Sequence, residues 1–146
     1  MNKEKFTIDI NASKSKVWKT LWDDETYRKW TSAFAEGSSA ETDWKEGSTV
    51  RFHDGKGNGM ISRIEKNIPL EQMSIKHLGE IKDGVEDTTS EAVSTWSGAM
   101  EEYRLTEKNG VTTVKVEMDM NEQWKEFFNE VWPKALAKLK ELAEAK

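Results

Sequence analysis

Apolar and polar residues alternate from Lys5 to Ile10, which predicts a half-buried strand. After Ser13, a residue type that favours the N-cap of a helix, apolar residues recur every three or four positions. The pair Asp23-Asp24 interrupts this spacing, because aspartate competes for backbone donors inside a helix. The stretch therefore predicts two short helices with a bend between them, and we expect Asp24 to cap the second.

The two short helices carry a high density of rings. Five aromatic residues fall between Val17 and Phe34: Trp18, Trp22, Tyr27, Trp30 and Phe34. We interpret residues 13–34 as a plug that closes one end of the protein core. Trp18 and Trp22 are expected to anchor this plug. Trp30 and Phe34 lead into a Gly/Ser loop at 36–40, so we expect them to form a partly exposed gate.

Residues 41–120 read as strands joined by turns. Strands are predicted at 48–53, 60–66, 72–78, 96–107 and 111–120. Turn signals separate them: Asp54-Gly55, Asn58-Gly59, Pro69 and Lys108-Asn109-Gly110. Residues 81–95 are acidic and poor in large apolar side chains, which indicates a loop or a capped partial helix.

Residues 122–145 predict one long amphipathic helix, with apolar residues at three- and four-residue spacing from Trp124 to Leu142. Pro133 lies inside it and should bend its axis, since proline removes a backbone donor. An antiparallel sheet must cover its apolar face, and this helix is the one predicted element long enough to do so. The order of elements predicts an α+β protein.

Composition narrows the functional classes. The chain has 146 residues, no cysteine and a net charge of −5, with Lys and Glu interspersed. A nucleic-acid surface needs a concentrated basic face, so nucleic acid is not an expected partner. No apolar run is long enough to span a membrane, and the first residues do not resemble a signal peptide. We expect one cytoplasmic domain over residues 1–146.

Several segments carry a resemblance to a known family. Residues 10–30, which include Val17-Trp18 and Trp22-Asp23-Asp24-Glu25, resemble the opening of activator-of-heat-shock-protein-90-ATPase-like (Aha-type) domains of the START-like, or SRPBCC, superfamily. That family has Thr-Asp-Pro-Glu where this chain has Trp22 to Glu25. Residues 59–64 with Ile68-Pro69, residues 105–116, and Trp132 with the leucines after it resemble later family segments, although Val131 replaces the usual glycine.

The resemblance implies a helix-grip fold, which is START-like and similar to the birch-pollen allergen. In that fold a curved antiparallel sheet of six to seven strands grips a long C-terminal helix, and two short helices follow the first strand. It also implies non-enzymatic binding of a small hydrophobic ligand in a cavity between sheet and helix. Two alternatives stay open: a partner-binding module related to chaperone ATPase activators, and a polyketide-cyclase-like enzyme. We expect a monomer or homodimer.

Ten residues are candidates for lining such a cavity: Trp30, Phe34, Trp44, Phe52, Met73, His77, Trp96, Tyr103, Phe128 and Trp132. The competing interpretation is that these side chains fill the space themselves, as protein cores generally do. His77, among apolar neighbours, is more often a hydrogen-bonded structural residue than a base. Glu101 can reach the cavity, but a solvated or paired surface carboxylate is the commoner case.

No catalytic constellation is visible in the sequence. No serine has the flanking glycines of a nucleophile elbow, and the glycines at 55–59 join two strands rather than opening a helix. Two histidines without cysteine make a transition-metal site improbable. We therefore predict no metal, no cofactor and no enzymatic activity.

Overall fold

The computed structural model describes residues 2–145. Its strands are β1 (Asn2–Ile10), β2 (Ser39–Glu41), β3 (Thr49–His53), β4 (Gly59–Ile68), β5 (Gln72–Lys82), β6 (Val85–Asp87), β7 (Met100–Lys108) and β8 (Val111–Met120). Its helices are α1 (Lys14–Trp22), α2 (Asp24–Trp30), α3 (Glu91–Ser94) and α4 (Glu122–Glu144), with a short 3₁₀ helix at Thr31–Ala33. None of the helices in this part of the chain is long and apolar enough to cross a membrane.

The strands form one antiparallel sheet in the order β1-β8-β7-β5-β4-β3-β2, and β6 pairs with the free end of β5. Within residues 2–145 the sheet has eight strands rather than six or seven. The prediction missed β2 and β6 because each has three residues, too few to show an alternating pattern. Short α3 is the capped partial helix, since the Ser90 hydroxyl accepts from the Val93 amide at 3.2 Å.

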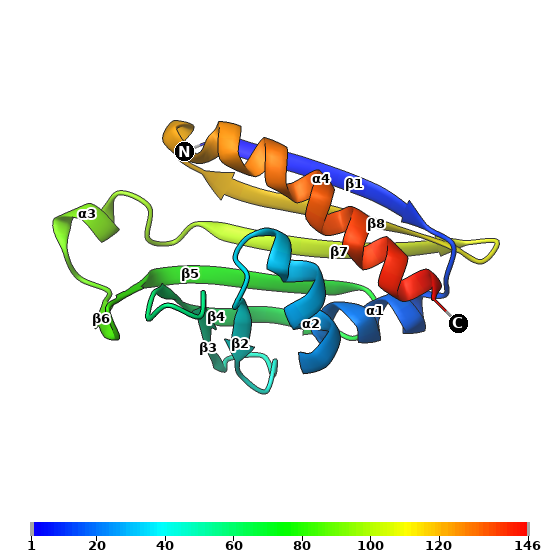
Figure 1. Ribbon diagram of the computed structural model, residues 1–146, viewed down its shortest axis with the longest axis horizontal. Helices are drawn as coiled ribbons and strands as arrows, with labels where there is room; N and C mark the ends of the chain where they lie inside the picture. Colours follow the sequence, from blue (N-terminus) through cyan, green and yellow to red (C-terminus); the bar gives the residue numbers. More distant parts are fainter. Residues whose placement is uncertain (1, 146) are drawn as a thin grey trace.

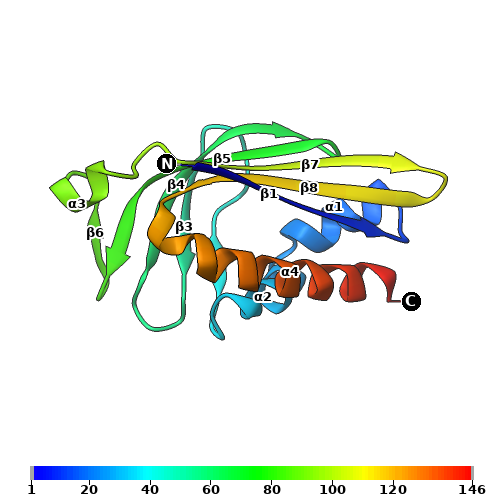
Figure 2. The same ribbon diagram turned by 90° about the horizontal axis from the view of Figure 1, so that it is seen from above.

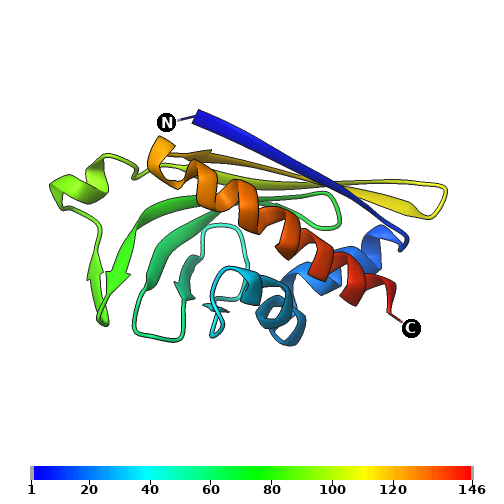
Figure 3. The same cartoon turned by 45° about the horizontal axis from the view of Figure 1, so that its top comes forward.

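The helices gather on one face of the sheet. Figures 1 and 2 show α4 lying along the curved sheet, with α1 and α2 on the same side. Figure 3 shows β6 and α3 at the opposite end of the molecule from α1. A curved antiparallel sheet around a long C-terminal helix, with two short helices after the first strand, is the helix-grip arrangement. That prediction is confirmed.

The bend between the short helices lies at Asp23, within the predicted pair Asp23-Asp24, but the cap is one residue earlier than predicted. The Ser13 hydroxyl caps α1 by accepting from the Lys16 amide at 3.2 Å. Asp23 has extended backbone angles (φ −64°, ψ 138°), so it ends α1 and is itself the N-cap of α2. Asp24 is the first helical residue, where its charge suits the helix N-terminus. The prediction that Asp24 is the cap is therefore wrong by one position.

Helix α4 continues without a break through Pro133. Proline has no amide hydrogen, so the carbonyl of Asn129 lacks its helical donor. Both Pro133 and Asn129 are exposed, and water can satisfy that carbonyl. The buried side of α4 carries Ala135 and Leu139, which have no exposed surface, and it lies against β1 and the two short helices.

Candidate functional site: a ring-lined cavity

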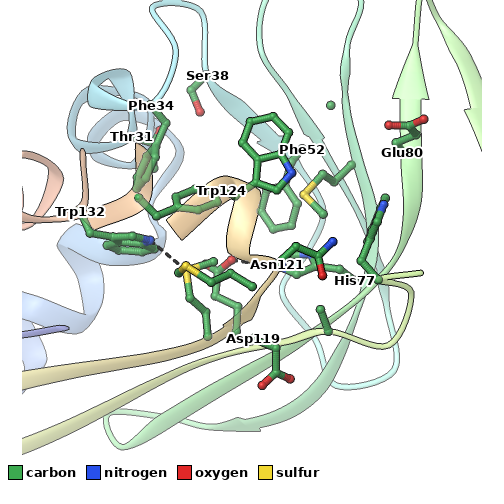
Figure 4. A pocket seen from close by; sticks show the side chains of 18 of the residues that line it. Thr31, Phe34, Ser38, Phe52, His77, Glu80, Asp119, Asn121, Trp124 and Trp132 are labelled. Carbon is green, nitrogen blue, oxygen red and sulfur yellow. Dashed lines mark hydrogen bonds and ion pairs between the residues drawn. The ribbon is translucent and has the colours of Figure 1, made fainter. Parts of the chain in front are cut away.

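A cavity of about 460 Å³ lies between the sheet and α4 (Figure 4). Its walls come from α2 and the 3₁₀ helix, from strands β3, β4, β5, β7 and β8, and from the first turns of α4. Nine of the lining side chains are aromatic: Tyr27, Trp30, Phe34, Phe52, Trp96, Tyr103, Trp124, Phe128 and Trp132. These rings therefore surround a space that they do not fill.

Eight of the ten predicted residues line this cavity: Trp30, Phe34, Phe52, His77, Trp96, Tyr103, Phe128 and Trp132. Met73 does not. It is 1% exposed, pairs across strands with Tyr103 and belongs to the hydrophobic core. The alternation along the strand predicted the correct face of the sheet for Met73. It did not show where along the strand the cavity lies. Ligand binding by the eight residues stays a prediction.

Trp44 is also outside the main cavity. Its backbone is left-handed (φ 62°), which turns its ring against Trp22 and Tyr27 at centroid distances of 4.7 and 5.6 Å. There it lines a second, smaller pocket of about 280 Å³. A positive φ at a tryptophan has no sequence signal, so the position of this ring was not predictable.

The predicted gate is wrong for Trp30. Its side chain has no exposed surface, and its indole nitrogen donates to the carbonyl of Leu21 at 3.1 Å. Phe34 is half-buried, with its ring 4.9 Å from that of Trp132. Trp124 is the most exposed of the lining rings, with 50% of its surface exposed. The apolar spacing of α4 indicated Trp124, but spacing alone does not reveal which turn faces the cavity rim.

A chain of hydrogen bonds forms the polar part of the cavity wall. The Ser62 hydroxyl lies 2.7 Å from Nδ1 of His77, and Nε2 of His77 lies 3.0 Å from Oε1 of Glu101. The Tyr103 hydroxyl donates to the other oxygen of Glu101. Two bulges in the β4–β5 pair, at Glu65 and at Leu78, flank the stretch in which Ser62 stands opposite His77.

The positions of the hydrogen atoms in this series of hydrogen bonds follow from the groups that can only accept. A carboxylate only accepts, so Nε2 of His77 carries a hydrogen and donates it to Glu101. In the neutral ring Nδ1 then accepts from Ser62, whose side chain is completely buried. With a neutral imidazole, the hydrogen-bonding groups of Ser62, His77 and Glu101 therefore all have partners. This confirms the hydrogen-bonded status of His77, but it places His77 and Glu101 together on the cavity wall.

The charge of Glu101 acts on both tyrosines of the chain. Burial, and then the charge of Glu101, raises the pKa of Tyr103 well above its usual value. The same two causes, in the same order, raise the pKa of Tyr27. Both hydroxyls therefore stay protonated at neutral pH. Among residues 2–145, no group of three or more His, Asp or Glu side chains is arranged to hold a metal ion.

The fold and the site define a helix-grip protein with a ring-lined cavity that is open on one side. Residues 11–144 match the family described as Activator of Hsp90 ATPase homolog 1-like protein. The chain belongs to this family. Among curated proteins, no sequence matches it.

Solved structures share the fold at low sequence identity. The Aha1 dimer from Colwellia psychrerythraea is 21% identical, with a TM-score of 0.75 over 99% of this chain and 97% of that one. CalU16 from Micromonospora echinospora is 18% identical, with a TM-score of 0.69 over 97% of this chain and 76% of its own. Protein MLL2253 from Mesorhizobium loti is 12% identical, with a TM-score of 0.76 over 97% and 96%. These likenesses show the fold.

Proposed function

We propose that this protein binds a small, mostly apolar molecule in the cavity between the sheet and α4. The observation that carries the proposal is the space of about 460 Å³ that nine rings surround without filling. The cavity is open to solvent on one side, where the ring of Trp124 is 50% exposed, so a molecule can enter it. Pockets for small ligands typically measure roughly 300–1,000 Å³, with mostly apolar walls and a few placed polar groups.

The polar groups are concentrated in one place on the wall. His77 is 5% exposed, and the Glu101 side chain is 15% exposed. Their positions are fixed by Ser62 on one side and Tyr103 on the other. A ligand with an apolar body and one polar end would be oriented by this arrangement, with its body among the rings.

Two measurements test the proposal. Native mass spectrometry of purified protein shows whether a small molecule is retained. Titration with the neutral fluorescent probe N-phenylnaphthylamine then measures binding directly. Ala99→Leu places a larger side chain in the cavity, because Ala99 is buried and lines it. Ala92→Leu is the matched control on exposed α3, away from the cavity lining.

We expect Ala99→Leu to lose most of the probe fluorescence and Ala92→Leu to keep it. Equal titration curves for the wild type and Ala99→Leu would place any bound probe outside the cavity. No probe binding to the wild type would show that the space is not used for molecules of this kind.

A second candidate function is that of a polyketide-cyclase-like enzyme. The Glu101 carboxylate favours it, because a carboxylate that His77 and Tyr103 hold beside an apolar cavity is able to take a proton from a bound molecule. The test is exchange of the hydrogens between the carbonyls of a small apolar diketone with deuterated water, followed by NMR. Exchange that is no faster with the wild type than with Glu101→Gln removes this candidate.

A further inference from the structure

We infer that the cavity selects cationic ligands: molecules with an apolar, ring-containing body and a protonated amine. This inference rests on the proposed function and names the chemical class that the site takes. The residue that carries it is Glu101, whose carboxylate faces the cavity from the middle of the sheet.

Among residues 2–145, no Lys or Arg pairs with Glu101; its partners are the Tyr103 hydroxyl and Nε2 of His77. Tyr103 is a neutral donor, and the Ser62–His77 hydrogen bond is satisfied when the imidazole is neutral. A protonated imidazole would donate to Ser62, and the completely buried hydroxyl hydrogen of Ser62 would then need another acceptor. Among residues 2–145, His77 is the acceptor found for that hydroxyl. Each Glu101 oxygen accepts one bond and keeps capacity for another.

The rest of the cavity lining adds no positive charge. Among the described residues that line the cavity, none is Lys or Arg, and two further carboxylates, Glu80 and Asp119, are present. Asp119 already accepts from the Met100 amide at 3.0 Å and lies 3.8 Å from the Lys3 ammonium. Glu101 is therefore the buried carboxylate to which a ligand would donate the missing hydrogen bonds. A carboxylate or phosphate on the ligand would instead meet like charge in a poorly solvated space.

The aromatic walls suit the same ligand. The faces of Trp, Tyr and Phe rings attract a cation that lies within about 6 Å of the ring centre. Tyr103 holds Glu101 directly, and the Phe52 ring lies 6.1 Å from that of His77. An ammonium group bound to Glu101 would thus have rings around it as well as an anion. Carboxylate and aromatic faces are two independent features that favour the same charge.

The experiment compares three probes with one ring system: naphthylmethylammonium, naphthylmethanol and naphthoate. Binding to the wild-type protein is measured by calorimetry at neutral pH. We expect the cation to bind about tenfold tighter than the neutral alcohol, the usual gain of a charge-assisted hydrogen bond over a neutral one, and naphthoate to bind most weakly. Because this comparison uses the wild-type chain, it decides the question even if a Glu101 variant fails to fold.

Glu101→Gln removes the charge and keeps the shape, so the preference for the cation should disappear. Glu102→Gln is the matched control, since the neighbouring strand residue faces the opposite side of the sheet and pairs with Arg104. It should keep the wild-type preference. If the alcohol binds as tightly as the cation, or if Glu101→Gln keeps the preference, this inference is wrong while the proposed function stands. If none of the three probes binds, both are overturned.

Discussion

The indole nitrogen of Trp30 donates a hydrogen bond to the carbonyl of Leu21, 3.1 Å away, and so ties α2 to the last turn of α1. The Leu21 carbonyl lies near the end of α1, where carbonyls lack helical donors. The same ring has no exposed surface and lies near Tyr103 and Trp132. Trp30 therefore joins the plug to both the sheet and α4.

Trp30→Ala is expected to destabilise the protein strongly. Removal of a fully buried tryptophan typically costs about 3–5 kcal/mol, and here the Leu21 carbonyl also loses its donor. Chemical denaturation measures the free energy of unfolding. Trp30→Phe, which keeps part of the ring volume, should lose less. A loss below about 1 kcal/mol for Trp30→Ala would show that the plug is not held through this residue.

Trp124→Ala is expected to weaken probe binding with little effect on stability. The side chain is 50% exposed yet lines the cavity, so the free energy of unfolding should fall by only about 0.5 kcal/mol. Phe127→Ala is the matched control, because Phe127 is 43% exposed on the same helix and is not part of the cavity lining. The measurement is N-phenylnaphthylamine affinity. Equal loss of affinity in both variants would argue against a rim position for Trp124.

Pro133→Ala is expected to stabilise the protein. Proline inside a helix costs roughly 3 kcal/mol relative to alanine, and the substitution restores a donor for the Asn129 carbonyl. We expect a gain of about 1–3 kcal/mol in the free energy of unfolding. We also expect altered probe affinity, because the neighbouring Trp132 lines the cavity. Unchanged affinity together with a straighter helix would show that Pro133 does not set the cavity volume.

The two tyrosines are expected to ionise only when the protein unfolds. Their folded-state pKa values are raised by burial and by the charge of Glu101, whereas the pKa of a tyrosine in an unfolded chain is about 10. Their contribution to stability is therefore complete below pH 10 and is lost as the pH rises through the folded-state values. Tyrosinate absorbance and tryptophan fluorescence should change together in an alkaline titration.

The prediction would be contradicted if tyrosinate absorbance rose at about pH 10 while the tryptophan fluorescence stayed native. Protein unfolded in guanidinium provides the reference curve. Since the chain has two tyrosines, half of the full absorbance change would mean that one hydroxyl is accessible.

We expect no stimulation of a chaperone ATPase by this chain alone. Family membership raises the possibility, but Lys and Glu are interspersed along the sequence, and a concentrated charged surface for a large partner is not indicated. Addition of the purified protein to the chaperone of the same organism, with turnover as the measurement, decides the point. A several-fold rise in turnover would make partner binding the leading function.

The fold was predictable because its long elements carry strong periodic patterns. The alternation in β8 and the apolar spacing of α4 indicated both elements with nearly correct ends. The site was only partly predictable. Periodicity placed His77 and Tyr103 on the inner face, but the contact between His77 and Glu101 depends on the β5–β7 pairing, and the contact between His77 and Ser62 depends on the two β4–β5 bulges. Pairing register and bulges are set by tertiary packing.

The pairing of β1 with β8 joins the first and last strands of the sheet, since Asn2 stands opposite Met120. Trp132 then closes the cavity from α4, stacked on Phe6 of β1 at a centroid distance of 5.7 Å. During synthesis, the rings of residues 18–52 emerge long before these partners do. A nascent chain that lacks α4 thus has no cover for its aromatic side chains, and association with other chains competes with folding at that stage. Helix α4, which roofs the cavity, is therefore needed before these aromatic side chains are covered.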